Sequence, residues 1–161
     1  MMSKTREAEV WQRVMAASGE VPAPKPAAGG LTPTKVLQVR EDELRDAHTY
    51  RSLAGRAPRD IRQSLLRLSE EERQHARRLE TVYYVMTGKR PAAWRPDGPA
   101  SSNGGNLNEE LRTRYREETA GAAEYRRLAE QADSFAPLFR ELGDDEERHA
   151  GTILRLLQRT L

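Results

Sequence analysis

Apolar residues recur at intervals of three and four along most of the chain after residue 31, a spacing typical of amphipathic helices. The pattern predicts four long helices, over residues 33–55, 58–87, 107–132 and 134–160. Thr32 followed by Pro33 indicates the start of the first helix, and Gly88 indicates the end of the second. Because no run alternates polar and apolar residues over a useful length, we expect an all-α fold.

The lengths of the connections predict how these helices pair. Short turns join the first helix to the second and the third to the fourth, whereas residues 88–106, rich in Gly and Pro, form a long crossover. Residues 4–17 carry four apolar side chains at helical spacing, and residues 19–30 are rich in Pro, Ala and Gly. We therefore expect two parts: an N-terminal amphipathic helix with its linker (1–30), and a bundle of two helical hairpins (31–161).

The chain also repeats itself. Residues 50–54 read YRSLA and residues 125–129 read YRRLA, and a glutamate stands seven residues before each tyrosine. The segments 68–75 (LSEEERQH) and 142–149 (LGDDEERH) align at an offset of 74, while the tyrosine segments align at 75. A duplicated hairpin can pack about a pseudo-twofold axis, which brings matching residues to one centre.

Helical periodicity predicts which side chains face that centre. On each helix, the residues spaced by three and four form one inward-facing stripe, here called its seam. The seam of the second helix contains Ile61, Leu65, Leu68, Glu72, His75, Leu79, Val82 and Met86. The seam of the fourth helix contains Phe139, Leu142, Glu146, His149, Ile153 and Leu156. The first helix shares one face among Val36, Glu43, Ala47, Tyr50 and Ala54, and the third among Leu111, Tyr115, Glu118, Ala122, Tyr125 and Ala129. The apolar faces of the first and third helices thus each contain one carboxylate, and the seams of the second and fourth helices each contain one carboxylate and one imidazole.

Four carboxylates in one interior repel each other and lose hydration, and these seams contain no lysine or arginine. Two divalent cations would balance the four charges, and a Glu on each of two helices with Glu-x-x-His on the other two is a recurring di-metal arrangement. The predicted ligands are Glu43, Glu72, His75, Glu118, Glu146 and His149.

The alternatives are weaker on geometry. A single Glu-x-x-His on a helix rich in Arg and Glu is usually a surface ion pair, but here two of the three histidines have it within matched repeats. Glu71 and Glu117 each fall about a hundred degrees off their seams. His48 lies away from the Glu43 face, and we expect it to be an ordinary surface histidine.

The composition of the chain excludes or disfavours several classes of site and function. The chain has no cysteine, which excludes disulfides, thiolate metal sites and iron–sulfur centres on it. Charged residues make up 32% of the chain but leave a net charge of only +2, with arginines and acids interleaved, which disfavours nucleic-acid binding. There is no run of eighteen apolar residues and no signal-peptide pattern, so we expect no membrane span and a cytoplasmic location.

Over residues 32–160 the sequence resembles the rubrerythrin and wider ferritin-like family. The likeness rests on residues 71–79 (EERQHARRL) and on Glu43-x6-Tyr50. It implies a ferritin-like four-helix bundle in which Glu72 and Glu146 bridge two metals. It also implies one imidazole per metal, from His75 and His149, and terminal carboxylates from Glu43 and Glu118. Tyr50 and Tyr125 would then hydrogen-bond the bridging carboxylates.

The resemblance also implies an activity. Two iron ions, or manganese or a mixed pair, would react as Fe(II) with hydrogen peroxide or dioxygen, in a peroxidase or ferroxidase. No rubredoxin-type domain is present, so electrons would come from a separate donor protein, and such bundles commonly form homodimers. A further glutamate usual in rubrerythrins is replaced by Gly121. The alternative is a non-catalytic iron-handling or assembly protein, in which Trp11 and Trp94 could dock a partner.

Overall fold

The structure is a computed structural model that describes residues 30–98 and 105–160. These residues form four α-helices and a short 3₁₀ helix: α2 (Pro33–Arg56), α3 (Arg59–Thr87), α4 (Leu107–Ala129), η1 (Asp133–Phe135) and α5 (Ala136–Thr160). The all-α prediction is confirmed for this part of the chain. The predicted N-terminal helix and most of its linker lie outside the described residues.

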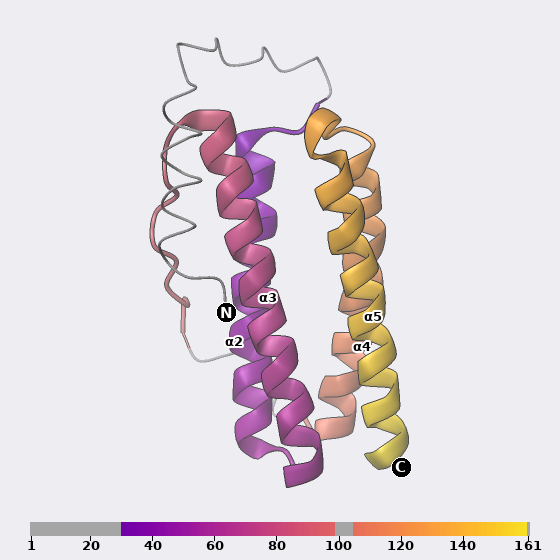
Figure 1. The fold of residues 1–161 in the computed structure, drawn as a ribbon. Coiled ribbons are helices and arrows are strands. Elements are labelled where there is room, and N and C mark those ends of the chain that lie inside the picture. Colours follow the sequence, from indigo (N-terminus) through magenta and orange to yellow (C-terminus); the bar gives the residue numbers. More distant parts are fainter. Residues whose placement is uncertain (1–29, 99–104, 161) are drawn as a thin grey trace, which may run out of the picture.

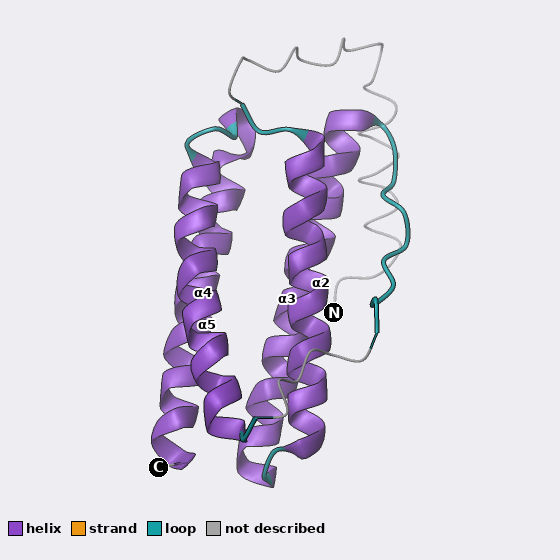
Figure 2. Cartoon of the chain, turned by 180° about the vertical axis from the view of Figure 1, so that it is seen from behind, coloured by secondary structure: helices purple, strands orange, loops and turns teal. Residues whose placement is uncertain are grey.

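The helices are arranged as two hairpins that stand side by side (Figures 1 and 2). α2 packs along α3 and α4 packs along α5, whereas contacts between the hairpins are much sparser. The start of α2 meets the end of α4, where the Leu31 amide donates to the Gln131 carbonyl at 2.9 Å. The connection after α3 runs down the outside of the first hairpin before α4 begins at the opposite end (Figure 1).

The helix boundaries follow local chemistry. The Thr32 hydroxyl accepts from the Lys35 amide at 3.2 Å and caps α2, with Pro33 in its first turn. Gly88 ends α3 in the left-handed region at φ 68°, a conformation that costs glycine little, and its amide donates to the Tyr84 carbonyl. Both predicted boundaries are confirmed.

The predicted end of the third helix, near residue 132, is wrong. α4 ends at Ala129 because the chain tightens there into i to i+3 turns, with the Gln131 amide donating to the Leu128 carbonyl at 3.0 Å. Asp133 then takes a positive φ of 45°, which an α-helix does not allow. These turns free the Gln131 carbonyl for Leu31, so the two hairpins are joined at this end.

The apolar core is divided into two clusters along the bundle. One contains Val36, Leu79, Val82, Tyr125, Leu128, Phe139 and Leu142 among others, and the second contains Tyr50, Leu53, Ile61, Leu65, Leu68, Leu111, Ile153 and Leu156. Burial of these side chains stabilises the bundle by roughly 1.5–3 kcal/mol each. Between the two clusters in the seams lie the buried glutamates and histidines, so apolar layers close off that polar layer on both sides.

The predicted core faces hold at most positions, with two corrections. Tyr115 is 37% exposed, because it lies at the margin of the α4 face that turns toward the outside of the second hairpin. His48 is not an ordinary surface histidine, since the crossover covers it and its ring lies 6.3 Å from that of Trp94 in an edge contact. Trp94 thus packs on its own bundle.

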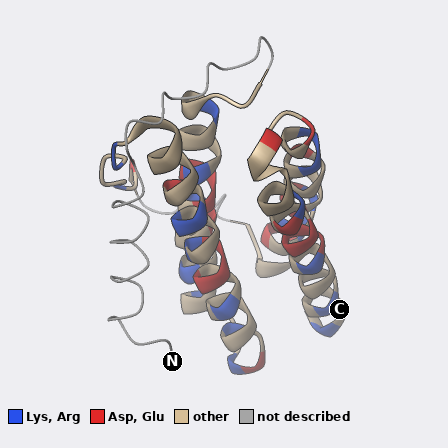
Figure 3. Ribbon diagram, turned by 45° about the horizontal axis from the view of Figure 1, so that its top comes forward, with Lys and Arg blue, Asp and Glu red and all other residues tan. Residues whose placement is uncertain are grey.

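Acidic and basic residues are interspersed over both hairpins (Figure 3). The interleaving predicted from the sequence is therefore seen as short-range ion pairing, as between Arg45 and Asp42 at 2.6 Å. Within the described ranges, no helix combines the length and apolarity that crossing a membrane requires.

Candidate metal centre

Six side chains converge in the polar layer between the two apolar clusters. They come from all four helices, and each is 1–6% exposed: Glu43, Glu72, His75, Glu118, Glu146 and His149. With one nitrogen or oxygen atom taken from each side chain, they form two overlapping groups of four residues, and a third group of Glu72, His75 and His149; within each group the atoms lie no more than 4.8 Å apart. The structure therefore brings together every residue predicted as a ligand.

The overlap of the two groups follows the sequence repeat. One group contains Glu43 and His75, the other contains Glu118 and His149, and Glu72 and Glu146 belong to both. A carboxylate shared by both groups can reach two ions, whereas the others can reach one. Their roles as bridging and terminal ligands remain a prediction, with which this geometry agrees.

Each imidazole presents Nδ1 to three carboxylates. For His75, Nδ1 lies 3.0 Å from Glu72, 3.1 Å from Glu43 and 3.2 Å from Glu146. For His149, Nδ1 lies 2.9 Å from Glu72, and its distances to Glu118 and Glu146 are 3.4 Å and 3.9 Å. The two rings are stacked with centroids 5.4 Å apart, so both Nδ1 atoms face the same small volume.

The tyrosines reach across from one hairpin to the other. Tyr50 donates its hydroxyl hydrogen to Glu118, and Tyr125 donates to Glu43. The expectation that the tyrosines bind the predicted bridging carboxylates, Glu72 and Glu146, is wrong. Tyr50 on α2 reaches the glutamate on α4, and Tyr125 on α4 reaches the glutamate on α2. Each tyrosine therefore orients the carboxylate that belongs to a single group.

Two further acids lie behind the imidazoles, and sequence reasoning missed this role. Nε2 of His149 lies 2.7 Å from Glu71, and Nε2 of His75 lies 3.2 Å from Asp145. An acceptor at Nε2 keeps the proton on that nitrogen and leaves Nδ1 free to bind a metal. The signal was present in the repeat: an acidic residue stands directly before the seam glutamate in both halves.

Burial and crowding perturb the pKa of the cluster strongly. Burial raises the pKa of Glu43 to about 8 and that of Glu146 to about 10, although contacts with His75 act in the opposite direction. Burial also opposes the charge on His149, but its contacts with carboxylates outweigh this and raise its pKa to about 11. Without a metal, protons on Glu43, Glu146 and the imidazoles therefore offset the negative charge of the cluster.

The donor atoms fit metal ions better than they fit each other. Among the described residues, both oxygens of Glu72, one oxygen each of Glu118 and Glu146, and Nδ1 of His149 are buried without a hydrogen-bond partner. The 2.9 Å approach of His149 to Glu72 is a close contact that lacks hydrogen-bond alignment. Unpaired buried acceptors are costly, and cation binding satisfies several of them at once. This buried Glu and His group could hold a metal ion.

The surroundings of the cluster do not follow the twofold pattern. Asp46 stands three residues after Glu43, where the second half has Gly121. Asp46 pairs with Arg114 on α4 at 2.6 Å, while burial raises its pKa to about 7 against the attraction of Arg114. A Cβ at Gly121 would lie 3.0 Å from an oxygen of Glu146, so a larger side chain there would require the Glu146 carboxylate to shift by a few tenths of an ångström.

The acids set aside in the sequence as alternative ligands are placed away from the donor groups. Glu117 is exposed and pairs with Arg114, and Glu71 contacts only the outer nitrogen of His149 and Arg148. In comparisons with family models, curated proteins and solved structures, this chain matches none. The interpretation of the centre therefore rests on its own geometry.

Proposed function

We propose that this chain is a non-haem di-iron protein of the rubrerythrin and ferritin-like type that reacts Fe(II) with hydrogen peroxide or dioxygen. The observation that carries the proposal is the convergence of six potential ligands, three from each half of a duplicated hairpin, in two groups that share Glu72 and Glu146. Four carboxylates and two imidazoles match the charge and ligand preference of two divalent ions.

When bound, two ferrous ions would supply the two electrons that, with two protons, reduce hydrogen peroxide to two molecules of water, both irons ending as Fe(III). The protein's own contribution is positional. Tyr50 and Tyr125 hold the terminal carboxylates, and Glu71 and Asp145 hold the Nε2 atoms so that Nδ1 points inward. The apolar clusters on both sides exclude bulk water from this layer.

The chain contains no cysteine, so nitrogen and oxygen atoms are the donors available to the metals. Nitrogen and oxygen donors of this kind also suit manganese, so a manganese or mixed pair belongs to the same proposal. Electrons to regenerate Fe(II) would come from a separate donor protein.

The test begins with metal content. The full chain, freed of metal and loaded anaerobically with Fe(II), is expected to bind two irons. Glu72→Ala is expected to lose both, since Glu72 belongs to both groups. The matched control is Glu70→Ala on the same helix, whose side chain is 51% exposed and pairs only with Arg77, so it should retain both irons. Equal behaviour of the two variants would refute the metal centre.

Reactivity is tested next, on the loaded protein. Addition of hydrogen peroxide is expected to produce ferric absorption much faster than the same concentration of free Fe(II) does. A specific observation favours a second candidate, a non-catalytic iron-handling protein: position 121, beside Glu146, is a glycine and supplies no further carboxylate ligand. Two bound irons that oxidise no faster than free iron would select this second function.

A further inference from the structure

The outer face of the second hairpin carries an apolar groove between α4 and α5. It has a volume of about 400 Å³, and its lining includes Tyr115, Ala122, Ala123, Ala150, Gly151 and Leu154 together with the charged residues Arg126 and Glu147. Tyr115 is 37% exposed and Leu154 is 45% exposed, which makes them two of the largest apolar side chains open to solvent among the described residues. Two large apolar side chains exposed in one groove indicate a surface that binds another segment or molecule.

The sequence repeat shows what the equivalent face of the first hairpin does. Tyr115 corresponds to Arg40 at the offset of 75, and Leu154 corresponds to Glu80 at the offset of 74. Arg40 and Glu80 form an ion pair at 2.7 Å, and Arg40 also donates to the Ala92 carbonyl at 3.1 Å. With Trp94 against His48, the crossover therefore covers the first groove with the chain's own residues. The second groove has apolar residues in place of that ion pair.

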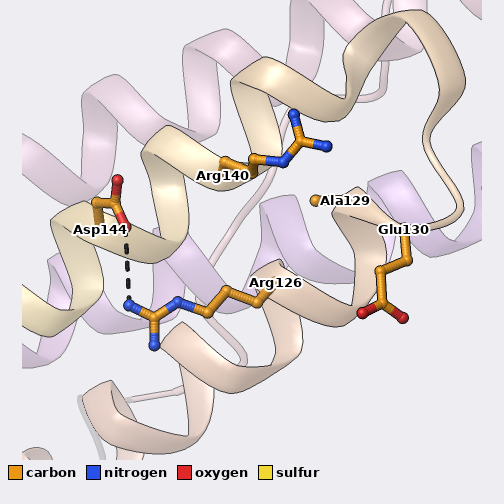
Figure 4. A pocket seen from close by; sticks show the side chains of 5 residues that line it. All are labelled: Arg126, Ala129, Glu130, Arg140 and Asp144. Atoms are coloured by element: carbon orange, nitrogen blue, oxygen red, sulfur yellow. Dashed lines mark ion pairs between the residues drawn. The ribbon is translucent and has the colours of Figure 1, made fainter.

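The second groove continues along the hairpin toward the end of α4. Arg126 also lines a neighbouring hollow of about 440 Å³ with Ala129, Glu130, Arg140 and Asp144 (Figure 4). From Tyr115 to Glu130, α4 rises by about 22 Å, the length of a helix of about fifteen residues. Small side chains on the floor of the groove would let the backbone of such a helix approach closely.

One segment of this chain matches the groove in length and position. Residues 4–17 are fourteen residues with Ala8, Trp11, Val14 and Met15 at helical spacing. Leu31 is fixed to Gln131, next to the Glu130 end of the groove, by the hydrogen bond between their backbones. Residues 18–30 include Pro22, Pro24 and Pro26, and thirteen residues in an extended polyproline II conformation would reach about 40 Å, enough to pass around one helix of about 10–12 Å diameter.

We propose that residues 4–17 form an amphipathic helix that docks in the groove between α4 and α5, with Trp11 covering Tyr115 and Leu154. The tether makes this docking intramolecular, so that even weak contacts suffice to populate it. Each hairpin is then covered on its outer face by a tryptophan-bearing segment of the same chain, the crossover on the first and the N-terminal segment on the second.

The experiment uses the full chain carrying Trp94→Phe, so that Trp11 is the single remaining tryptophan. We expect its emission to be blue-shifted and weakly quenched by acrylamide. Leu154→Arg in the groove should shift the emission to that of solvated indole and raise the quenching constant several-fold. Leu66→Arg, at a leucine on α3 that is 44% exposed and lies outside the groove, should leave both unchanged. Ala123→Glu is the second groove variant, and circular dichroism checks that each variant is folded.

Three results would overturn the proposal. The first is solvated Trp11 emission in the parent chain. The second is an equal effect of the α3 and α5 arginine variants. The third is protection of Trp11 only at concentrations where sedimentation shows a dimer that the groove variants dissociate, which would assign the groove to a second copy. None of these results depends on metal binding, so the proposed di-iron function is tested separately.

Discussion

Loading the metal-free centre with two divalent cations should release about four protons at pH 7. The prediction follows from the groups that carry protons in the absence of metal. Burial raises the pKa of Glu43 to about 8 and that of Glu146 to about 10. His75 and His149 are buried too, but the carboxylates around them raise the pKa of each imidazole far above neutrality. Metal binding requires all four groups without these protons.

The expected number changes with pH in a defined way. At pH 7 a carboxyl group with a pKa of about 8 is about nine-tenths protonated, so Glu43 contributes nearly one proton. Glu146, His75 and His149 contribute one each, and Glu72 contributes none, because contacts with both imidazoles outweigh its burial and lower its pKa to about 2. Two divalent cations then replace four protons with no change in net charge. At pH 9 Glu43 has ionised, and the release falls toward three.

Isothermal titration calorimetry with Mn(II) measures this number, since the apparent binding enthalpy varies with the ionisation enthalpy of the buffer in proportion to the protons released. Mn(II) avoids oxidation during the titration. The Glu70→Ala variant serves as the control, because that exposed side chain lies outside the cluster and should not change the count. A release near zero at pH 7 would mean that the carboxylates are ionised before metal arrives. The argument that cations replace protons in this core would then be refuted.

Three further predictions concern the same layer. Because the pKa of Glu43 is raised in the metal-free fold, its contribution to stability is complete below pH 4.5 and is lost as the pH rises through about 8. Thermal melts should therefore show the metal-free protein to be less stable at pH 9 than at pH 6. The metal-loaded protein should be more stable at pH 9 than at pH 6. Asp145→Asn removes an anionic acceptor behind one imidazole, and competition titrations should show metal affinity reduced by about 10–100-fold. Gly121→Ala should weaken metal binding because its Cβ would lie 3.0 Å from Glu146, whereas Gly151→Ala, 3.7 Å from the nearest atom, should leave affinity unchanged and stabilise α5 by about 1 kcal/mol in denaturant melts.

Much of the fold and the ligand set could be predicted because both depend on periodicity within single helices. The spacing of three and four identifies the buried face of a helix without knowledge of its neighbours. Duplication then adds independent support, since Glu72 and His75 on one seam are matched by Glu146 and His149 on another. The structure buries all four residues, as the pattern predicted.

Relations between the hairpins could not be predicted in this way. Periodicity places Tyr50 and Glu118 on inward faces, but their contact depends on the rotation and axial offset of α2 against α4, which no single-helix pattern contains. The same applies to Glu71, which lies off its own seam yet reaches His149 of the other hairpin. The predicted burial of Tyr115 is wrong for a related reason. Tyr115 lies at the edge of its helix face, and the position of α5 decides that it is exposed.

The departure from twofold symmetry at one pair of positions bears directly on the centre. On one side, Asp46 adds a fifth carboxylate near Glu72 and Glu118, and the Arg114 guanidinium that binds it joins α2 to α4. On the other side, Gly121 brings the α4 backbone close to Glu146 and adds no charge. The two donor groups contain the same residue types, so these neighbours distinguish them, together with the acid behind each imidazole, which is Glu71 for His149 and Asp145 for His75. The duplicated hairpin therefore provides two equivalent ligand sets in unequal electrostatic surroundings, which is the condition under which two metals in one centre differ in affinity and redox potential.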